Sequence, residues 1–301
     1  MLTNWPMDIK INEEKLFEIF IWTDDFLKAL DRLSLPAQKG QRRREPGLAL
    51  SEVISILVYY HHSGYKCFEY YYERCVRSTL QSHFPQAPSY CRFIQLIPRA
   101  LKPMYWMGKV CGLMSQATGV YFVDSKKLPV CDNRRIHSHK VFEGIAQRGK
   151  TSTGWFFGLK IHLVINNLGK IMNFVITTAN VADNTKRVLD KLLSNIQGKC
   201  FGDKGYISAH FEHYYQKGIH LITRIRKNMK NKPMDWHDKL MLARRGVIES
   251  VNDILMTVFD IDHTRHRSPI NALTHVLGAV LAYNFYDQKP SVSFPKINNN
   301  P

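Results

Sequence analysis

The stretch Val120-Tyr121-Phe122-Val123-Asp124 decides how the fold of this chain is interpreted, because an apolar run stops there at a carboxylate. Such a run after Gly119 predicts a short buried strand that ends at Asp124. A second run, Cys200-Phe201-Gly202, is followed by Asp203 and then by Lys204-Gly205-Tyr206. Gly205 permits a tight turn after the second aspartate, so both acids are expected at strand ends.

A third acidic residue, Glu249, lies in residues 240–259, whose apolar spacing predicts a single helix. Arg245 and Asn252 lie four residues before and three after Glu249, so all three share one face of that helix. Two carboxylates at strand ends and one on a helix can hold two divalent cations, which activate an attacking oxygen and stabilise the leaving oxygen of a phosphodiester. The three acids therefore predict an enzyme that cuts or joins nucleic acid.

The segments between these acids set the topology. Residues 155–165 and 170–177 predict a hairpin that follows the first strand. The full order is three strands, a helix, a strand, a helix, a strand and the glutamate helix. This order is expected of a ribonuclease H-like fold, an α/β mixed sheet flanked by helices, in which the first and fourth strands lie side by side. The other elements are predicted as helices over 185–197, 208–217 and 270–285 and strands over 199–202 and 219–225.

The domain organisation follows from a change in periodicity near residue 115. Residues 1–115 predict a helical domain, and residues 116–287 predict the ribonuclease H-like catalytic domain that carries the three acids. The last segment, 288–301, is rich in Asn and Pro and predicts a disordered tail.

The charge of the chain predicts a polyanionic partner. The 301 residues carry a net charge of +17, and residues 116–301 alone account for +13. Such a surplus favours nucleic acid or an anionic membrane surface. No apolar stretch reaches the roughly 20 residues that span a bilayer, and the N-terminus has no secretion signal. The six cysteines form no Cys-x-x-Cys pair, which predicts reduced thiols in a cytoplasmic protein.

Several residues near the three acids have two readings. Asp183 is the main alternative to Asp203 as the second carboxylate. It precedes the predicted helix 185–197, so we expect it instead to cap that helix or to support the site. Lys160 and His162 share one strand and can point toward the site, whereas Trp155-Phe156-Phe157 is expected in the strand core rather than as a base-stacking platform. The pairs His137-x-His139 and His210-x-x-His213 suggest zinc, but no cysteine pair stands at a zinc-ligand spacing to either.

Basic segments follow the last strand and the glutamate helix. They are expected to grip DNA phosphates, with a solvated loop as the alternative. The run Arg42-Arg43-Arg44 is explained equally well as a contact with the DNA backbone and as an exposed run of charge with no partner. The residues expected to contact DNA are Arg245, Lys204, Arg224, Arg226, Lys227, Lys230, Arg265 and Arg267.

Taken together and in order, six segments resemble bacterial insertion-sequence transposases of the DDE class, in particular the group numbered nine-eighty-two. The resemblance implies a ribonuclease H-like core with the acidic triad on Asp124, Asp203 and Glu249, two Mg²⁺ or Mn²⁺ ions, and binding to terminal inverted repeats. It also implies that the helical domain of residues 1–115 binds the DNA ends and that the protein is located at the bacterial nucleoid. A homodimer is expected because two ends must be joined. The segments are 123–125, 154–162, 202–206, 226–230, 244–252 and 263–268.

The chain departs from one signature of related transposases. These often carry Tyr-x-x-Arg-x-x-x-Glu-x-x-x-x-x-x-Lys around the glutamate. Arg245 fits, but Leu242 stands in the Tyr position and Met256 in the Lys position. The phosphate-binding lysine therefore stays unassigned, and a basic residue of 224–232 is the expected substitute.

The predicted activity is cleavage at the ends of an insertion sequence, followed by attack of the freed 3′-hydroxyl on target DNA. Two alternatives stay open at this point. One is a structure-specific nuclease or resolvase with the same fold and metals. The other is a catalytically inactive DNA-binding derivative, against which the three intact carboxylates argue.

Overall fold

The computed structural model describes residues 11–33, 47–151, 154–207, 209–224, 233–263 and 266–293. Its contacts divide the chain into two units. The first comprises residues 1–107, 258–260 and 270–285, and the second comprises residues 108–257, 261–269 and 286–301.

The first unit is helical, as the sequence predicts. Its core is built from apolar faces such as that of α2, where Val53, Ile54 and Val58 are fully buried. Its elements are α1 (Glu13–Leu33), α2 (Leu50–His62), α3 (Phe68–Tyr70), the π-helix η1 (Tyr71–Thr79), α4 (Tyr90–Leu96), the 3₁₀-helix η2 (Ile97–Ala100), the first half of α5 (Leu101–Met114) and α10 (Pro269–Asn284).

The last helix, α10, packs in the first unit, whereas the sequence-based division assigns it to residues 116–287. The reason is that α10 is buried over most of its length and its partners lie on α2. The His62 ring nitrogen lies 3.0 Å from the Ala282 carbonyl oxygen, and the rings of His61 and His275 are 4.7 Å apart.

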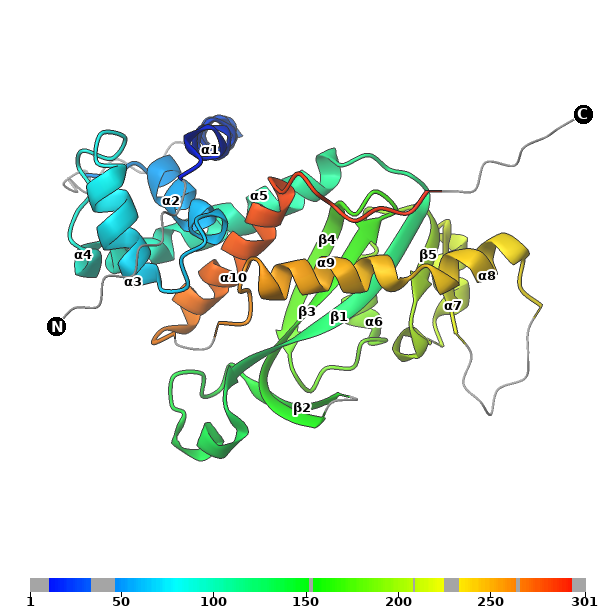
Figure 1. Ribbon diagram of the computed structural model, residues 1–301. Coiled ribbons are helices and arrows are strands. Elements are labelled where there is room, and N and C mark those ends of the chain that lie inside the picture. The colour runs from blue at the N-terminus through cyan, green and yellow to red at the C-terminus, as the bar shows by residue number, and fades with distance from the viewer. Residues whose placement is uncertain are drawn as a thin grey trace, which may run out of the picture. The chain divides into compact units, whose positions relative to one another are not determined.

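A six-stranded mixed sheet forms the second unit, which confirms the predicted fold class (Figure 1). The strand order is β2-β3-β1-β5-β6, and β4 also pairs with β3. β2 and β4 share the same side of β3 because they pair with different parts of that long strand. The strands are β1 (Val120–Cys131), β2 (Gln147–Thr151), β3 (Gly154–Asn166), β4 (Ile171–Thr178), β5 (Gly198–Gly202) and β6 (Ile219–Thr223).

The neighbours of β1 agree with the expected topology, but its length does not. β1 runs parallel to β5 with Phe122 opposite Phe201, so the first and fourth predicted strands lie side by side. The prediction that the first strand ends at Asp124 is wrong, because β1 continues antiparallel to β3 as far as Cys131. Only the burial changes at Asp124, where fully buried residues give way to half-buried ones.

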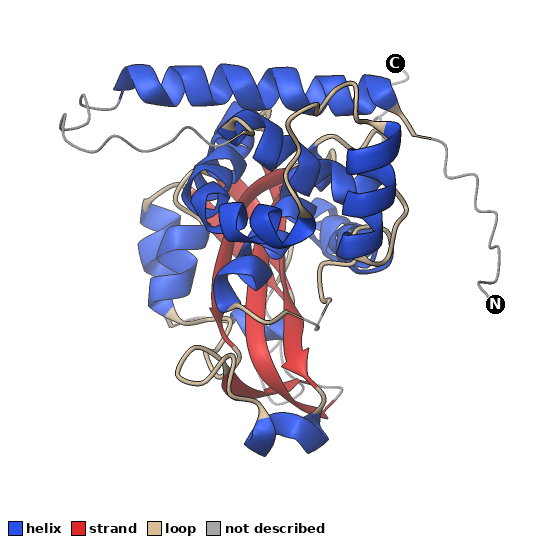
Figure 2. Ribbon diagram, turned by 90° about the vertical axis from the view of Figure 1, so that its left-hand side faces the viewer, coloured by secondary structure: helices blue, strands red, loops and turns tan. Residues whose placement is uncertain are grey.

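Helices cover the two faces of the sheet (Figure 2). α6 packs on β3 and β4, and its buried Leu189 and Leu192 share a core with Tyr121 and Val123 of β1. α9 contacts β1 and lies across it in Figure 1. The helical elements are η3 (Asn133–Ser138), α6 (Lys186–Leu192), η4 (Lys204–Tyr206), α7 (Phe211–Gln216), α8 (Trp236–Ala243) and α9 (Gly246–Thr257).

The prediction of one helix over residues 240–259 is also wrong. α8 ends at Ala243 and α9 begins at Gly246, because Arg244 leaves helical geometry with φ −82° and ψ 5°. Its side chain is held outside the helix, where Nη1 donates to the Ser293 carbonyl oxygen at 2.6 Å. Glu249 therefore lies in the first turn of a helix, where the helix dipole favours an acid.

Part of the predicted tail has defined contacts. The Val292 amide donates to the Asn167 carbonyl oxygen at 2.7 Å, and the Asn167 side chain donates to the Val292 carbonyl oxygen at 3.1 Å. Residues 294–301 lie outside the described residues. In the described ranges, none of the helices combines the length and the apolar character needed to cross a membrane.

Candidate functional site

Asp124 is positioned by β1 and by α9. Side chains alternate along a strand, so Tyr121 and Val123 enter the core under α6 while Asp124 points to the opposite face. There the buried Asn252 of α9 donates from Nδ2 to Asp124 Oδ2 at 2.9 Å. The Asp124 side chain is only 19% exposed. This neighbour fixes the orientation of the carboxylate before any ligand arrives.

Asp203 follows β5 directly and caps the short η4. Its Oδ1 accepts a hydrogen bond from the Gly205 amide at 2.8 Å. A Cβ atom added to Gly205 would stand 2.9 Å from that same oxygen, too close for an ordinary contact. The glycine of the Gly-Asp-Lys-Gly-Tyr motif therefore allows the backbone to approach the carboxylate.

Glu249 is joined to Asp124 through Arg245. The Arg245 guanidinium donates from Nη2 to Glu249 Oε1 at 2.5 Å, and its Nη1 lies 3.7 Å from Asp124 Oδ1. Arg245 is 16% exposed and Glu249 is 57% exposed. One cationic side chain thus spans two of the three predicted acids.

The pKa of Asp124 links the three acids electrostatically. Burial raises this pKa from 3.8 to about 6, and the nearby Arg245 guanidinium opposes that rise. The negative charges of Asp203 and Glu249 raise the pKa further. Asp203 and Glu249 therefore both lie close enough to Asp124 to disfavour its ionised form.

No three His, Cys, Asp or Glu side chains in the described ranges come within reach of a single metal ion. The guanidinium of Arg245, which spans Asp124 and Glu249, gives a physical reason. The donor set nevertheless fits a hard divalent cation, because Mg²⁺ and Mn²⁺ prefer carboxylate oxygens. Burial is the main cause of the raised pKa of Asp124, and a bound cation would favour the ionised carboxylate that burial disfavours. The histidine pairs at 137/139 and 210/213 form no such group in the described part either.

Asp183 forms a second acidic centre beside the first. Its Oδ1 accepts a hydrogen bond from Lys160 Nζ at 2.7 Å and lies 3.8 Å from His162 Nδ1. The helix-capping interpretation is wrong, because α6 begins at Lys186 and its N-cap is Thr185. Asp183 instead flanks the turn after Asp203, since its Oδ2 lies 3.6 Å from a Cβ built on Gly205.

The pair of Lys160 and Asp183 provides a stability test. Both side chains are largely buried, at 10% and 25% exposure, so Lys160→Met leaves Asp183 without its cation in a partly desolvated place. We expect the free energy of unfolding to fall by about 2 to 3 kcal/mol. Urea unfolding followed by circular dichroism measures this change.

The control for that variant is Lys186→Met, which removes the more exposed ion pair with Asp190. Such a pair contributes less than about 1 kcal/mol. The double variant Lys160→Met/Asp183→Asn should recover part of the loss, because it no longer buries an unpaired charge. Equal destabilisation by the two methionine variants would contradict the importance of the Lys160–Asp183 pair.

His162 lies on the same face as Lys160. Burial lowers the pKa of His162 to about 4, while Asp183 raises it and Lys160 lowers it. The ring is therefore neutral near pH 7, and its Nε2 lies 3.0 Å from Thr177 Oγ1. In the β1–β3 register His162 stands opposite Ser125, so it shares the α6 face of the sheet rather than the face of Asp124.

Tyr206 is a residue that the sequence does not single out on its own. It is fully buried, and burial raises the pKa of its phenol. The negative charges of Asp183, Asp124 and Asp203 raise this pKa further. The only signal in the sequence is that Tyr206 is the last residue of the Lys204-Gly205-Tyr206 segment that follows Asp203.

The predicted DNA-contacting residues fall into three groups. Arg245 is 16% exposed and contacts Asp124 and Glu249. Lys204, Arg224 and Arg267 are exposed, as a contact with phosphate requires. Arg226, Lys227, Lys230, Arg265 and the run Arg42-Arg43-Arg44 lie outside the described residues.

The expectation that the Trp155 side chain belongs to the strand core is wrong. Phe156 is buried, but Trp155 is 61% exposed. The difference arises because β3 extends beyond the helices, and its first residues pair only with β2 and the end of β1.

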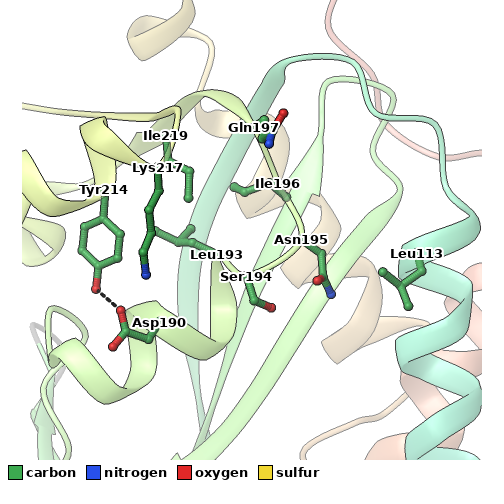
Figure 3. Close-up of a pocket in the computed structure, with 10 residues that line it drawn as sticks. All are labelled: Leu113, Asp190, Leu193, Ser194, Asn195, Ile196, Gln197, Tyr214, Lys217 and Ile219. Carbon is green, nitrogen blue, oxygen red and sulfur yellow. Dashed lines mark hydrogen bonds between the residues drawn. The ribbon is translucent and has the colours of Figure 1, made fainter.

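A hollow of about 580 Å³ lies away from these acids (Figure 3). It is bounded by Gln197 and Ile219, at the starts of β5 and β6, whereas Asp203 follows the end of β5. Its Asp190 accepts a hydrogen bond from the Tyr214 hydroxyl at 3.1 Å. The predicted site is therefore not in this hollow.

Comparison with known proteins adds one match. Residues 114–269 match the model of a protein family described as "Transposase DDE domain". The matched segment covers just over half of the 301 residues and contains Asp124, Asp203 and Glu249. A search of curated proteins found no match to the chain.

Proposed function

We propose, from the premise that this chain belongs to the transposase DDE domain family, that it cuts DNA at the inverted-repeat ends of an insertion sequence and joins the freed 3′-hydroxyl ends to target DNA. Within the family, the group numbered nine-eighty-two is our proposed assignment. The proposal places the protein at the nucleoid in the bacterial cytoplasm, where its DNA substrate lies.

One observation supports the assignment of the catalytic acids above the others. Asp203 and Glu249 both raise the pKa of Asp124, although the three residues are far apart in the sequence. A buried carboxyl whose pKa is raised by neighbouring acids is typical of sites that bind metal or exchange protons. We therefore propose Asp124, Asp203 and Glu249 as the catalytic residues.

DDE transposases in general use divalent metal ions, and we propose two Mg²⁺ or Mn²⁺ ions held by these three carboxylates. Bound ions of this kind activate the attacking oxygen and stabilise the leaving oxygen of a phosphodiester. Asn252 orients Asp124 through its 2.9 Å hydrogen bond, and the Gly205 amide orients Asp203. Arg245 balances the charge of Asp124 and Glu249 and can then turn to a DNA phosphate.

The remaining cations are proposed to hold the DNA in place. Phosphate contacts fix the register of a duplex without reading its sequence. Lys204, Arg224 and Arg267 are exposed for this task. We propose that residues 1–115 recognise the inverted repeat and that two copies of the chain act together, because two ends must be joined.

The test is a combined cleavage and strand-transfer assay. Purified protein is mixed with a labelled duplex that contains the terminal repeat flanking its reading frame and with a supercoiled target plasmid. We expect Mg²⁺-dependent nicking at the repeat boundary and transfer of label into the plasmid, with neither product in EDTA. Nicking without transfer would support a nuclease or resolvase instead. Binding without nicking in Mg²⁺ or Mn²⁺ would support an inactive derivative.

A further inference from the structure

The part of the sheet beyond Asp124 forms an arm, which we define as residues 126–151 and 154–158. Within it, Pro129 and Cys131 of β1 pair antiparallel with Gly158 and Phe157 of β3, and β2 pairs with residues 154–158 of β3. In Figure 1, β2 and the adjoining ends of β1 and β3 extend away from α6 and α9. The arm therefore offers surface that the helices of its unit do not cover.

The arm is strongly basic. Between residues 126 and 158 the sequence holds seven Lys or Arg and two acids. None of the arm's five exposed cations forms an ion pair with another described residue, so their charge is not neutralised there. These five are Arg134, Arg135, Lys140, Arg148 and Lys150. A solvated charge run explains the exposure of each one, but not the aromatic residue placed among them.

That aromatic residue is Trp155, 61% exposed on β3. Lys150, its direct partner on β2, holds Nζ 5.6 Å from the centre of the indole ring. Asn133 of η3 fixes the backbone at this point by donating to the Trp155 carbonyl oxygen at 2.7 Å. An exposed indole can pack against the sugars of a duplex while the neighbouring cations contact its phosphates.

The register places this surface on the same side of the sheet as Asp124. Trp155, Phe157 and Leu163 are separated by even numbers of residues on β3, so they point to one face. Leu163 stands opposite Asp124 on β1. Arg148 stands opposite Phe157, and Lys150 stands opposite Trp155. The cations of β2 therefore face the side from which Asp124 projects.

The distance between this surface and Asp124 matches a short length of DNA. Cys131 lies seven positions after Asp124, which corresponds to about 23 Å along an extended strand. A duplex rises about 3.4 Å per base pair, so this corresponds to about seven base pairs. A duplex with its cut bond at Asp124 can follow the strand and reach the arm.

We infer that the arm is a binding surface for duplex DNA, contacting the backbone within about ten base pairs of the cut bond through Arg134, Arg148, Lys150 and Trp155. This inference rests on the proposed function. It adds the surface that holds the flanking duplex and the position of that duplex on the protein.

The first test measures affinity. The variant Arg134→Ala/Arg148→Ala/Lys150→Ala is compared with Arg187→Ala/Lys191→Ala/Lys217→Ala, which removes three exposed cations outside the arm. Each protein is titrated with a random-sequence duplex of about 40 base pairs over a range of salt concentrations. For the arm variant we expect the slope of log Kd against log salt to fall by about 2.7, because each lost phosphate contact contributes about 0.9. The control variant should change the slope less. Equal slopes for the two variants would overturn the inference.

The second test locates the DNA. Benzoylphenylalanine replaces Trp155, or Tyr215 of α7 as a control, which is similarly exposed at 60%. After irradiation with the terminal-repeat duplex, position 155 should cross-link within about ten base pairs of the cut, and position 215 should not. Metal-dependent cutting with no cross-link from position 155 would overturn the inference about the arm and would leave the proposed function unaffected. A wild-type protein that neither binds nor cuts the duplex would overturn the proposed function itself.

Discussion

Asp203→Asn is expected to slow metal-dependent DNA cleavage by about a thousandfold, and so are Asp124→Asn and Glu249→Gln. Each amide keeps the shape of the side chain but removes a negative ligand, and a loss of about 4 kcal/mol of transition-state stabilisation gives this factor. Affinity for duplex DNA should stay within about twofold or rise slightly, because the change removes negative charge. Rates come from single-turnover cleavage of the terminal-repeat duplex, and affinities from titration in EDTA.

The matched control for Glu249→Gln is Asp253→Asn, one turn further along α9. Asp253 is 69% exposed and lies 3.5 Å from Lys126, so its contribution to the site is screened by water. This variant should cut DNA within a few-fold of the wild-type rate. Strand transfer at the wild-type rate by Asp203→Asn would remove Asp203 from the proposed catalytic set.

Asp124→Asn should also stabilise the metal-free protein, and the gain should depend on pH. The pKa of Asp124 is about 6 in the folded protein against 3.8 for the ordinary carboxyl. A raised carboxyl pKa means that the folded state binds the proton more tightly than the unfolded state. Stability from this group is therefore present below about pH 4 and is lost as pH rises toward 6. Two pKa units correspond to about 3 kcal/mol, which is the expected upper bound of the gain at pH 7.5.

Urea unfolding in EDTA at pH 4.5 and pH 7.5 measures this effect. The difference in unfolding free energy between Asp124→Asn and wild type should be small at the lower pH and large at the higher one. Added Mg²⁺ should stabilise the wild type and not the variant, because a cation stabilises only the state that binds it. The same difference at both pH values would show that the effect is one of packing and not of charge.

Local patterns explain which parts of the fold could be predicted. The β3–β4 hairpin has apolar strands separated by a turn that ends in Gly169, and both strands appear where the sequence indicates them. β2 could not be predicted, because Gln147-Arg148-Gly149-Lys150-Thr151 has no apolar alternation. It is a strand because β3 offers it a free edge, and such pairing overrides weak propensity. The same pairing carries β1 past Asp124 through Lys126 and Lys127.

Some contacts of the candidate site could also be predicted from the sequence, and others could not. The topology could bring Asp124 and Asp203 together because β1 and β5 are neighbours, and helix spacing could place Arg245 beside Glu249. The contact of the Arg245 guanidinium with Asp124 forms only once α9 packs on β1, and no periodicity marks the break between α8 and α9 that precedes it. The ion pair of Lys160 and Asp183 joins residues 23 apart, so its geometry exists only once β3 and the segment before α6 are folded.

The uninterrupted passage of β1 from the core through Asp124 has a mechanical consequence. Between Asp124 and Leu128 every residue of β1 is paired with β3, so this stretch has no unpaired residue at which the strand could bend as a hinge. We expect that bending of the arm also moves the backbone of Asp124, because every residue of β1 between Asp124 and the register shift at Pro129 and Cys131 is held by β3.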